Sequence, residues 1–175
     1  MSMKLKTETI VNTMFFFVWF VCIGLLVKAG ALLIPYGLSI FNEQAAKDLY
    51  KGMTLFAFMD FSFIQYSMLV FYKVFLLCVQ AYIAFQLTEL LRDFNLALPF
   101  NDQVVKLMEK ICIAIIFVWF IVLLHNIHLK ILEKTVGLES NYLETGSLIW
   151  LGMVYVLAQI FRRGIEIQSD NEYTI

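Results

Sequence analysis

The stretch MEKICIAIIFVWFIVLLH, residues 108–125, decides the fold class of this chain. It carries no charge from Ile111 to Leu124. A helix of about 20 residues crosses the roughly 30 Å hydrocarbon core of a bilayer. Backbone groups in lipid must be hydrogen-bonded within the segment, which a helix achieves. The stretch therefore predicts a membrane-spanning helix.

Three other stretches share this character. The chain has 175 residues, 61% of them hydrophobic, with a mean hydropathy of +0.80, whereas a soluble domain is roughly half apolar. Long continuous runs, rather than short alternating segments, disfavour a β-barrel. We expect an all-α fold, a polytopic membrane four-helix bundle in one transmembrane domain over residues 1–175. The predicted spans are about 10–33, 63–87, 108–127 and 146–163.

The distribution of lysine and arginine predicts the orientation. The run Ile10–Val27 is longer than the roughly 7–15 apolar residues of a signal peptide, so we expect an uncleaved anchor. Four basic residues lie near the spans on one side, and seven on the other. Because basic residues favour the cytoplasmic side, both termini are expected in the cytoplasm. The seven are Lys4, Lys6, Arg92, Lys106, Lys110, Arg162 and Arg163.

The connections carry local signals of their own. In the first outer loop, Asn42 is a good cap for a short helix, expected either on the outer interface or packed on the spans. Pro99 and Asn101 end one helix and begin the next, which predicts a cytoplasmic helical hairpin before the third span. Gly137 is expected to stop the third helix. The acidic tail, 164–175, is expected either as a frayed end or as an edge strand on a partner.

A ligand cavity is the first candidate site. Lys73 is predicted near the membrane midplane, where a cation costs about 2.5–3.5 kcal/mol, unless it snorkels outward. Tyr66 and Gln80 lie seven residues either side of it, on one helical stripe. His125 and His128, one turn apart, predict a metal or pH-sensing pair or, alternatively, interfacial hydrogen bonding. The cavity candidates are Lys28, Tyr66, Lys73, Gln80 and His125.

Other site chemistry is not indicated. Cys22, Cys78 and Cys112 are isolated within apolar runs, so we expect packing residues and no metal site. No catalytic or nucleotide-binding motif is present, and neither an enzyme nor a cofactor is expected. A net charge of −1 gives no argument for direct nucleic-acid binding. Gly152 is expected to allow close helix packing.

Three sequence segments resemble one family. AQIFRRGIEI at 158–167, NEYTI at 171–175 and LPFN at 98–101 are similar to the bacterial domain of unknown function 2975 family. The resemblance implies a four-span inner-membrane protein of unestablished activity, often encoded beside a small helix-turn-helix transcription regulator. Glu is common in the family where Gln159 stands, so an acidic role is not implied there.

These observations lead to two hypotheses. The first is a non-enzymatic membrane protein that binds or regulates a cytoplasmic partner, a helix-turn-helix regulator. The second is a small transporter, ligand sensor or immunity-type protein that holds an anionic or peptide ligand near Lys73. Beyond the lipid bilayer, self-association into a homo-oligomer is left open. The partner-binding candidates are Arg92, Phe100, Asp102, Arg162, Arg163 and Glu166.

Overall fold

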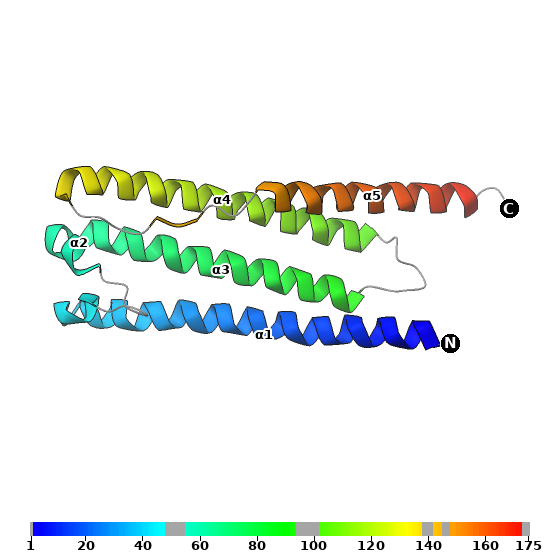
Figure 1. Cartoon of the computed structure of the whole chain (residues 1–175), viewed down its shortest axis with the longest axis horizontal. Coiled ribbons are helices and arrows are strands. Elements are labelled where there is room, and N and C mark those ends of the chain that lie inside the picture. The colour runs from blue at the N-terminus through cyan, green and yellow to red at the C-terminus, as the bar shows by residue number, and fades with distance from the viewer. Residues whose placement is uncertain (1, 48–54, 94–101, 138–141, 145–147, 173–175) are drawn as a thin grey trace. The chain divides into compact units, whose positions relative to one another are not determined.

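All the regular secondary structure in the part of the chain that the structure describes is helical (Figure 1). The computed structural model describes residues 2–47, 55–93, 102–137, 142–144 and 148–172. The predicted all-α class is confirmed. The elements are α1 (Ser2–Ser39), the 3-10 helix η1 (Glu43–Lys47), α2 (Phe56–Phe61), α3 (Phe63–Asp93), α4 (Asp102–Val136) and α5 (Leu148–Glu172).

Three of these helices are long and apolar enough to cross a membrane: Glu8–Ser39, Phe63–Arg92 and Asp102–Thr135. They contain the first three predicted spans. Many of their large apolar side chains are exposed, Phe20 to 77% and Ile64 to 68%. Apolar surface on this scale suits lipid rather than water. The fourth predicted span falls largely on α5, which is not among these three, so the count of four stays a prediction.

The chain divides into two compact units, each made of separated stretches. The hairpin unit (residues 1–22, 82–117 and 146–175) holds the start of α1, the end of α3, the start of α4, and α5. The loop unit (residues 23–81 and 118–145) holds the end of α1, the short helices, the start of α3 and the end of α4.

The core of the loop unit joins α1, α3 and α4. The α3 residues Tyr66, Leu69, Val70 and Leu77 are buried, at the three-, four- and seven-residue spacing of one helix face. In lipid such a core is held by close van der Waals packing and interhelical hydrogen bonds. The other core residues are Ala29 and Leu32 of α1, Leu55 and Phe58 around α2, and Leu129 and Leu132 of α4.

Two local signals in the loops act as expected. Asn42 caps η1, because its side-chain oxygen accepts a hydrogen bond from the Gln44 N–H at 3.1 Å. Gly137 ends α4 with a φ of +71°, and its N–H donates to the Glu133 carbonyl at 2.8 Å. This left-handed conformation is the usual place for glycine after a helix.

In the hairpin unit, a helix is found on either side of the turn predicted around Pro99. α3 ends at Asp93, and α4 begins at Asp102. The turn itself, including Phe100, lies outside the described residues. Val104 and Ile111 are buried, whereas Lys106 is exposed, so the start of α4 has the amphipathic pattern expected of a projecting helix.

Two expectations about α5 are wrong. The tail is helical from residue 164 to Glu172, not an edge strand. The Arg163–Glu166 ion pair, three residues apart at 2.5 Å, supports the helix beyond its apolar part. Gly152 makes no close approach either: it is exposed, and a Cβ added there would meet no described atom within 4 Å.

Candidate functional site

Four hydroxyl groups link α1 to α3 in the loop unit. Tyr36 of α1 donates a hydrogen bond to Ser67 Oγ at 3.0 Å, and Ser67 donates to the Phe63 carbonyl at 2.8 Å. Ser39 donates to the Tyr36 carbonyl at 2.6 Å and lies 2.8 Å from the Tyr66 hydroxyl. Because Ser39 has already used its only proton, Tyr66 must be the donor to it.

This arrangement is reciprocal, and we call Tyr36, Ser39, Tyr66 and Ser67 the hydroxyl clamp. One tyrosine–serine–carbonyl relay runs from α1 to α3, and the other runs from α3 to α1. Tyr66 and Ser39 are fully buried. The Tyr36 and Tyr66 rings also pack against each other, with centroids 5.7 Å apart. Each buried hydroxyl in the second relay therefore has its partner, and the two helices are fixed in one register.

A second set of polar groups lies between α3 and α4 in the same unit. The Tyr72 ring packs edge-on against His125 and His128, both with centroids 5.9 Å away. His128 Nε2 lies 2.5 Å from Gln65 Oε1. Since a carbonyl oxygen only accepts, His128 Nε2 carries the proton in this bond. We call Gln65, Tyr72, Lys73, His125, Asn126 and His128 the polar cluster.

Asn126 determines which ring nitrogen of its neighbour His125 carries the proton. Its amide NH₂ donates to the Leu143 carbonyl at 2.8 Å, and its oxygen accepts the Leu143 N–H at 3.0 Å. The same oxygen lies 3.2 Å from His125 Nδ1, so Nδ1 must be the donor there. The neutral His125 ring therefore keeps a lone pair on Nε2.

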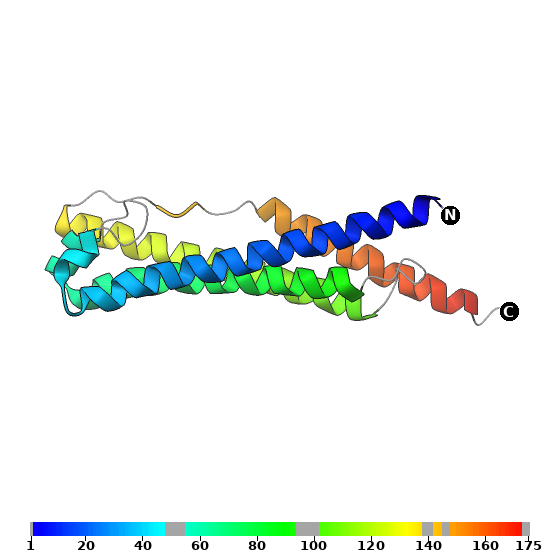
Figure 2. The same ribbon diagram turned by 90° about the horizontal axis from the view of Figure 1, so that it is seen from below.

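These two bonds also hold the chain after α4. Leu143 pairs with a residue ten positions before the end of the helix, so the segment 142–144 returns alongside α4 (Figure 2). Tyr142 donates to the Glu133 carboxylate, and this hydrogen bond raises the pKa of Tyr142 above its ordinary value.

The structure brings together only some of the predicted cavity residues. Lys73 is half-buried and lies within electrostatic range of His125, which is 1% exposed. Tyr66 belongs to the hydroxyl clamp instead. Gln80 is half-buried, and Lys28 is exposed on α1.

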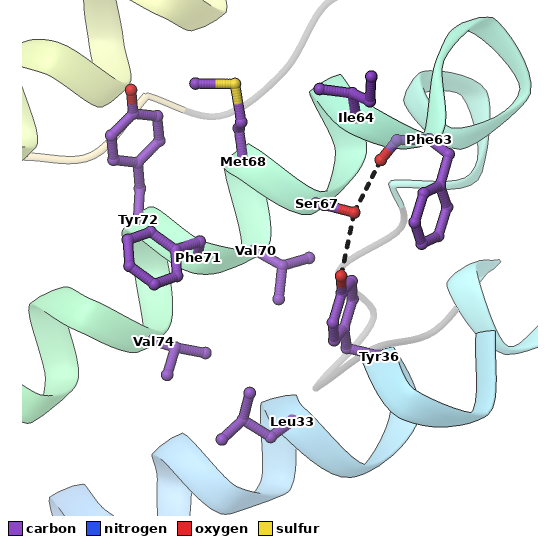
Figure 3. A pocket seen from close by; sticks show the side chains of 10 residues that line it. All are labelled: Leu33, Tyr36, Phe63, Ile64, Ser67, Met68, Val70, Phe71, Tyr72 and Val74. Atoms are coloured by element: carbon purple, nitrogen blue, oxygen red, sulfur yellow. Dashed lines mark hydrogen bonds between the residues drawn. The ribbon is translucent and has the colours of Figure 1, made fainter. Parts of the chain in front are cut away.

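A described pocket of about 700 Å³ lies elsewhere in the loop unit, between α1 and α3 (Figure 3). Its lining is almost wholly apolar, apart from Tyr36, Ser67 and Tyr72, and it includes none of the five predicted cavity residues. The remaining lining residues are Leu33, Phe63, Ile64, Met68, Val70, Phe71 and Val74.

Apart from Phe100, which lies outside the described residues, the predicted partner-binding residues lie in the hairpin unit, where most are engaged in ion pairs. Arg162 of α5 is paired with Glu109 of α4, both partly exposed. Arg163 pairs with Glu166, and Arg92 lies 3.9 Å from Glu89. Asp102 is exposed in the first turn of α4, where a negative charge favours the helix.

Sequence reasoning missed the serines of the clamp and the role of Asn126. A serine within a span is usually explained by a hydrogen bond to its own helix, which Ser39 and Ser67 also make. The partner of Asn126 is backbone, which leaves no signature in side-chain identity. A second hydroxyl at the matching level of the neighbouring helix was the available signal for the clamp.

Comparison with known proteins gives one match. No curated protein and no solved structure matches the chain. A family model described as "Protein of unknown function (DUF2975)" matches residues 54–175, from just before α2 through the end of the chain. This is more than half of the sequence, and it confirms the resemblance seen in the segments at 98–101, 158–167 and 171–175. The chain belongs to the DUF2975 family of proteins of unknown function.

Proposed function

We propose that the chain is a non-enzymatic integral membrane protein that binds a cytoplasmic partner through the end of α5 and the α3–α4 hairpin. The observation that carries this proposal is the Arg162–Glu109 ion pair, which joins the polar end of α5 to the start of α4 within one compact unit. An ion pair between exposed groups adds only about 0–1 kcal/mol of stability. In this proposal the ion pair instead holds the end of α5 beside the start of α4, so that the two helices form one surface for the partner.

The exposed chemistry of α5 supports a protein partner. Beyond Arg163 the helix is polar, yet Ile167 is 52% exposed beside Glu166. This exposed apolar side chain is proposed to meet the partner, with the charged residues around it at the rim of the contact. The family resemblance implies the kind of partner, a small helix-turn-helix regulator held at the membrane.

The same arrangement agrees with the proposed topology in a bacterial inner membrane. The hairpin unit contains the beginning of the chain, the hairpin ends of α3 and α4, and α5. Arg92, Lys106, Lys110, Arg162 and Arg163 all belong to it. Basic residues favour the cytoplasmic side, so both termini and the hairpin are proposed to lie there, after four crossings.

The test is retention of the partner by the detergent-solubilised protein. Full-length protein and a version ending at Arg163 are purified from their native host, and co-purifying proteins are identified by mass spectrometry. We expect a helix-turn-helix protein with the full-length chain only. Equal retention by the shortened chain would exclude the tail contact.

A charge exchange distinguishes positioning from direct contact. Arg162→Glu should weaken retention, because it sets two carboxylates against each other. If Arg162 acts by positioning α5, adding Glu109→Arg should restore retention. If restoration fails while both proteins remain folded, Arg162 contacts the partner itself. Lys134→Glu, an exposed charge reversal in the last turn of α4 and in the loop unit, provides the control and should leave retention unchanged.

A second candidate function is a ligand sensor, transporter or immunity-type protein that uses the polar cluster. Two observations favour it. His128 Nδ1 is buried with no hydrogen-bond partner among the described residues, which is uncommon and calls for an additional group. Lys73 places a positive charge near His125. Together they offer one acceptor and one cation to an anionic or peptide ligand that also carries a donor.

The contacts of α3 with α4 also bear on the depth of Lys73. Tyr72 lies against His125, which directly follows the uncharged run Ile111–Leu124. Lys73 is therefore proposed near the outer end of the span, within snorkelling reach of water, rather than at the midplane.

Lys73→Leu tests this candidate. We expect it to abolish retention of a small ligand in native mass spectrometry of the purified protein, while Lys28→Leu, the exposed lysine of α1, leaves retention intact. Unchanged retention in Lys73→Leu would remove the main support for a ligand site here.

A further inference from the structure

We propose that the apolar pocket between α1 and α3 binds the hydrocarbon chain of a neutral long-chain alcohol taken from the bilayer. This inference goes beyond partner binding and stands on different residues. The volume of the pocket is the first observation that supports the proposal. A volume of about 700 Å³ lies within the roughly 300–1,000 Å³ typical of small-molecule sites. A helix is about 10–12 Å across with its side chains, so a single chain suits a pocket of this size better than a second helix.

The position of the pocket indicates where its occupant comes from. Every lining residue belongs to the long apolar helices α1 and α3. Several of these side chains, including Leu33, Ile64 and Phe71, are about half to two-thirds exposed. In a membrane this exposed surface meets acyl chains rather than water. An amphiphile dissolved in the bilayer therefore reaches the pocket without crossing an aqueous phase.

The hydroxyl clamp determines which polar group of the occupant the pocket can bind. Tyr36 and Ser67 both line the pocket, as Figure 3 shows. The proton of Tyr36 is used on Ser67, and the proton of Ser67 is used on the Phe63 carbonyl. Only lone pairs remain on these two oxygens. A group of the occupant that binds these two oxygens must donate a hydrogen bond, as an alcohol does, whereas an ether or ester has no proton to give. The hydroxyl of Tyr72, the third polar lining residue, points away from Tyr36 and Ser67 (Figure 3).

Photolabelling of the full chain in phosphatidylcholine vesicles tests this specificity. The probes are hexadecanol carrying a diazirine in its chain and the methyl ether of the same molecule. Adducts are mapped by peptide mass spectrometry. We expect about three- to tenfold more labelling of α1 and α3 by the alcohol, the ratio that one net hydrogen bond gives. Equal labelling by the two probes would overturn the donor requirement.

Two variants make the result specific to the pocket. Leu33→Trp should reduce labelling by both probes, because the indole fills the mouth, whereas Ile127→Trp, equally exposed on α4, should not. Ser67→Ala frees the Tyr36 proton, so the ether should now label as well as the alcohol. Unchanged labelling of Leu33→Trp, or adducts of both probes that map outside α1 and α3, would overturn the proposal.

Discussion

At the scale of single residues, hydrogen-bond direction carries the most information. Ser39 donates to a backbone carbonyl and therefore must accept from Tyr66, which is fully buried. Removing the acceptor leaves a buried donor without a partner, at a cost of about 1–3 kcal/mol. Removing the donor leaves Ser39 with its carbonyl bond intact. Removing the acceptor is therefore expected to cost more stability than removing the donor.

We predict that Ser39→Ala lowers the free energy of unfolding by about 1–3 kcal/mol, and Tyr66→Phe by about 0.6 kcal/mol, the average for such bonds in membrane helices. The double variant should be no less stable than Ser39→Ala alone. Reversible denaturation in micelles measures these differences. Thr135→Ala, which removes an exposed hydroxyl bonded to its own helix, is the control. Additive losses would contradict the hydrogen bond between Ser39 and Tyr66, and a larger loss in Tyr66→Phe than in Ser39→Ala would contradict its direction.

Asn126 provides a second prediction at this scale. Its amide satisfies both backbone groups of Leu143, as a neighbouring strand would. Asn126→Ala removes both bonds, and we expect hydrogen exchange at the Leu143 amide to accelerate about tenfold. Gln65→Ala, which alters only the bond to His128, should leave that exchange unchanged. Equal acceleration in both variants would mean that the polar cluster, rather than Asn126, holds the segment.

At the scale of elements, the ends of helices follow local chemistry. Gly137→Ala places a side chain at a φ of +71°, so we predict a loss of about 1–2 kcal/mol in unfolding free energy. Gly152→Ala, in the exposed interior of α5, should gain about 0.5–1 kcal/mol, because alanine favours helix and no described atom is in its way. Denaturation monitored by tryptophan fluorescence compares the two. A loss at Gly152 would indicate a close neighbour there.

The sequence allowed prediction of those elements whose signals are local. Asn42 and Gly137 each act on their own helix, and each is found as expected. Tyr66 was grouped with Lys73 from a seven-residue spacing, yet its partner lies 27 positions away on another helix. The tail was expected as a frayed end or as an edge strand on a partner, yet the helix continues to Glu172. A helix can continue past a membrane boundary when its polar residues pair or are solvated.

At the scale of the whole molecule, the proposed partner surface requires the end of α5 and the start of α4 to lie on the same side of the membrane. The apolar part of α5, Leu148–Phe161, would be roughly 21 Å long, less than the roughly 30 Å core. Topology therefore cannot be argued from the length of α5 alone. The ion pair of Arg162 with Glu109 is the stronger constraint, because residues in contact lie on the same side.

The most direct test of the central claim, that the hairpin and the tail lie together in the cytoplasm, is cysteine accessibility in spheroplasts. Single cysteines replace Asp102, Glu166 and Glu144 in a chain whose Cys22, Cys78 and Cys112 are alanine. With a membrane-impermeant maleimide, Glu144→Cys should be labelled at once, and Asp102→Cys and Glu166→Cys only after permeabilisation. Labelling of Asp102→Cys and Glu166→Cys from opposite faces would contradict the claim and the partner surface built on it.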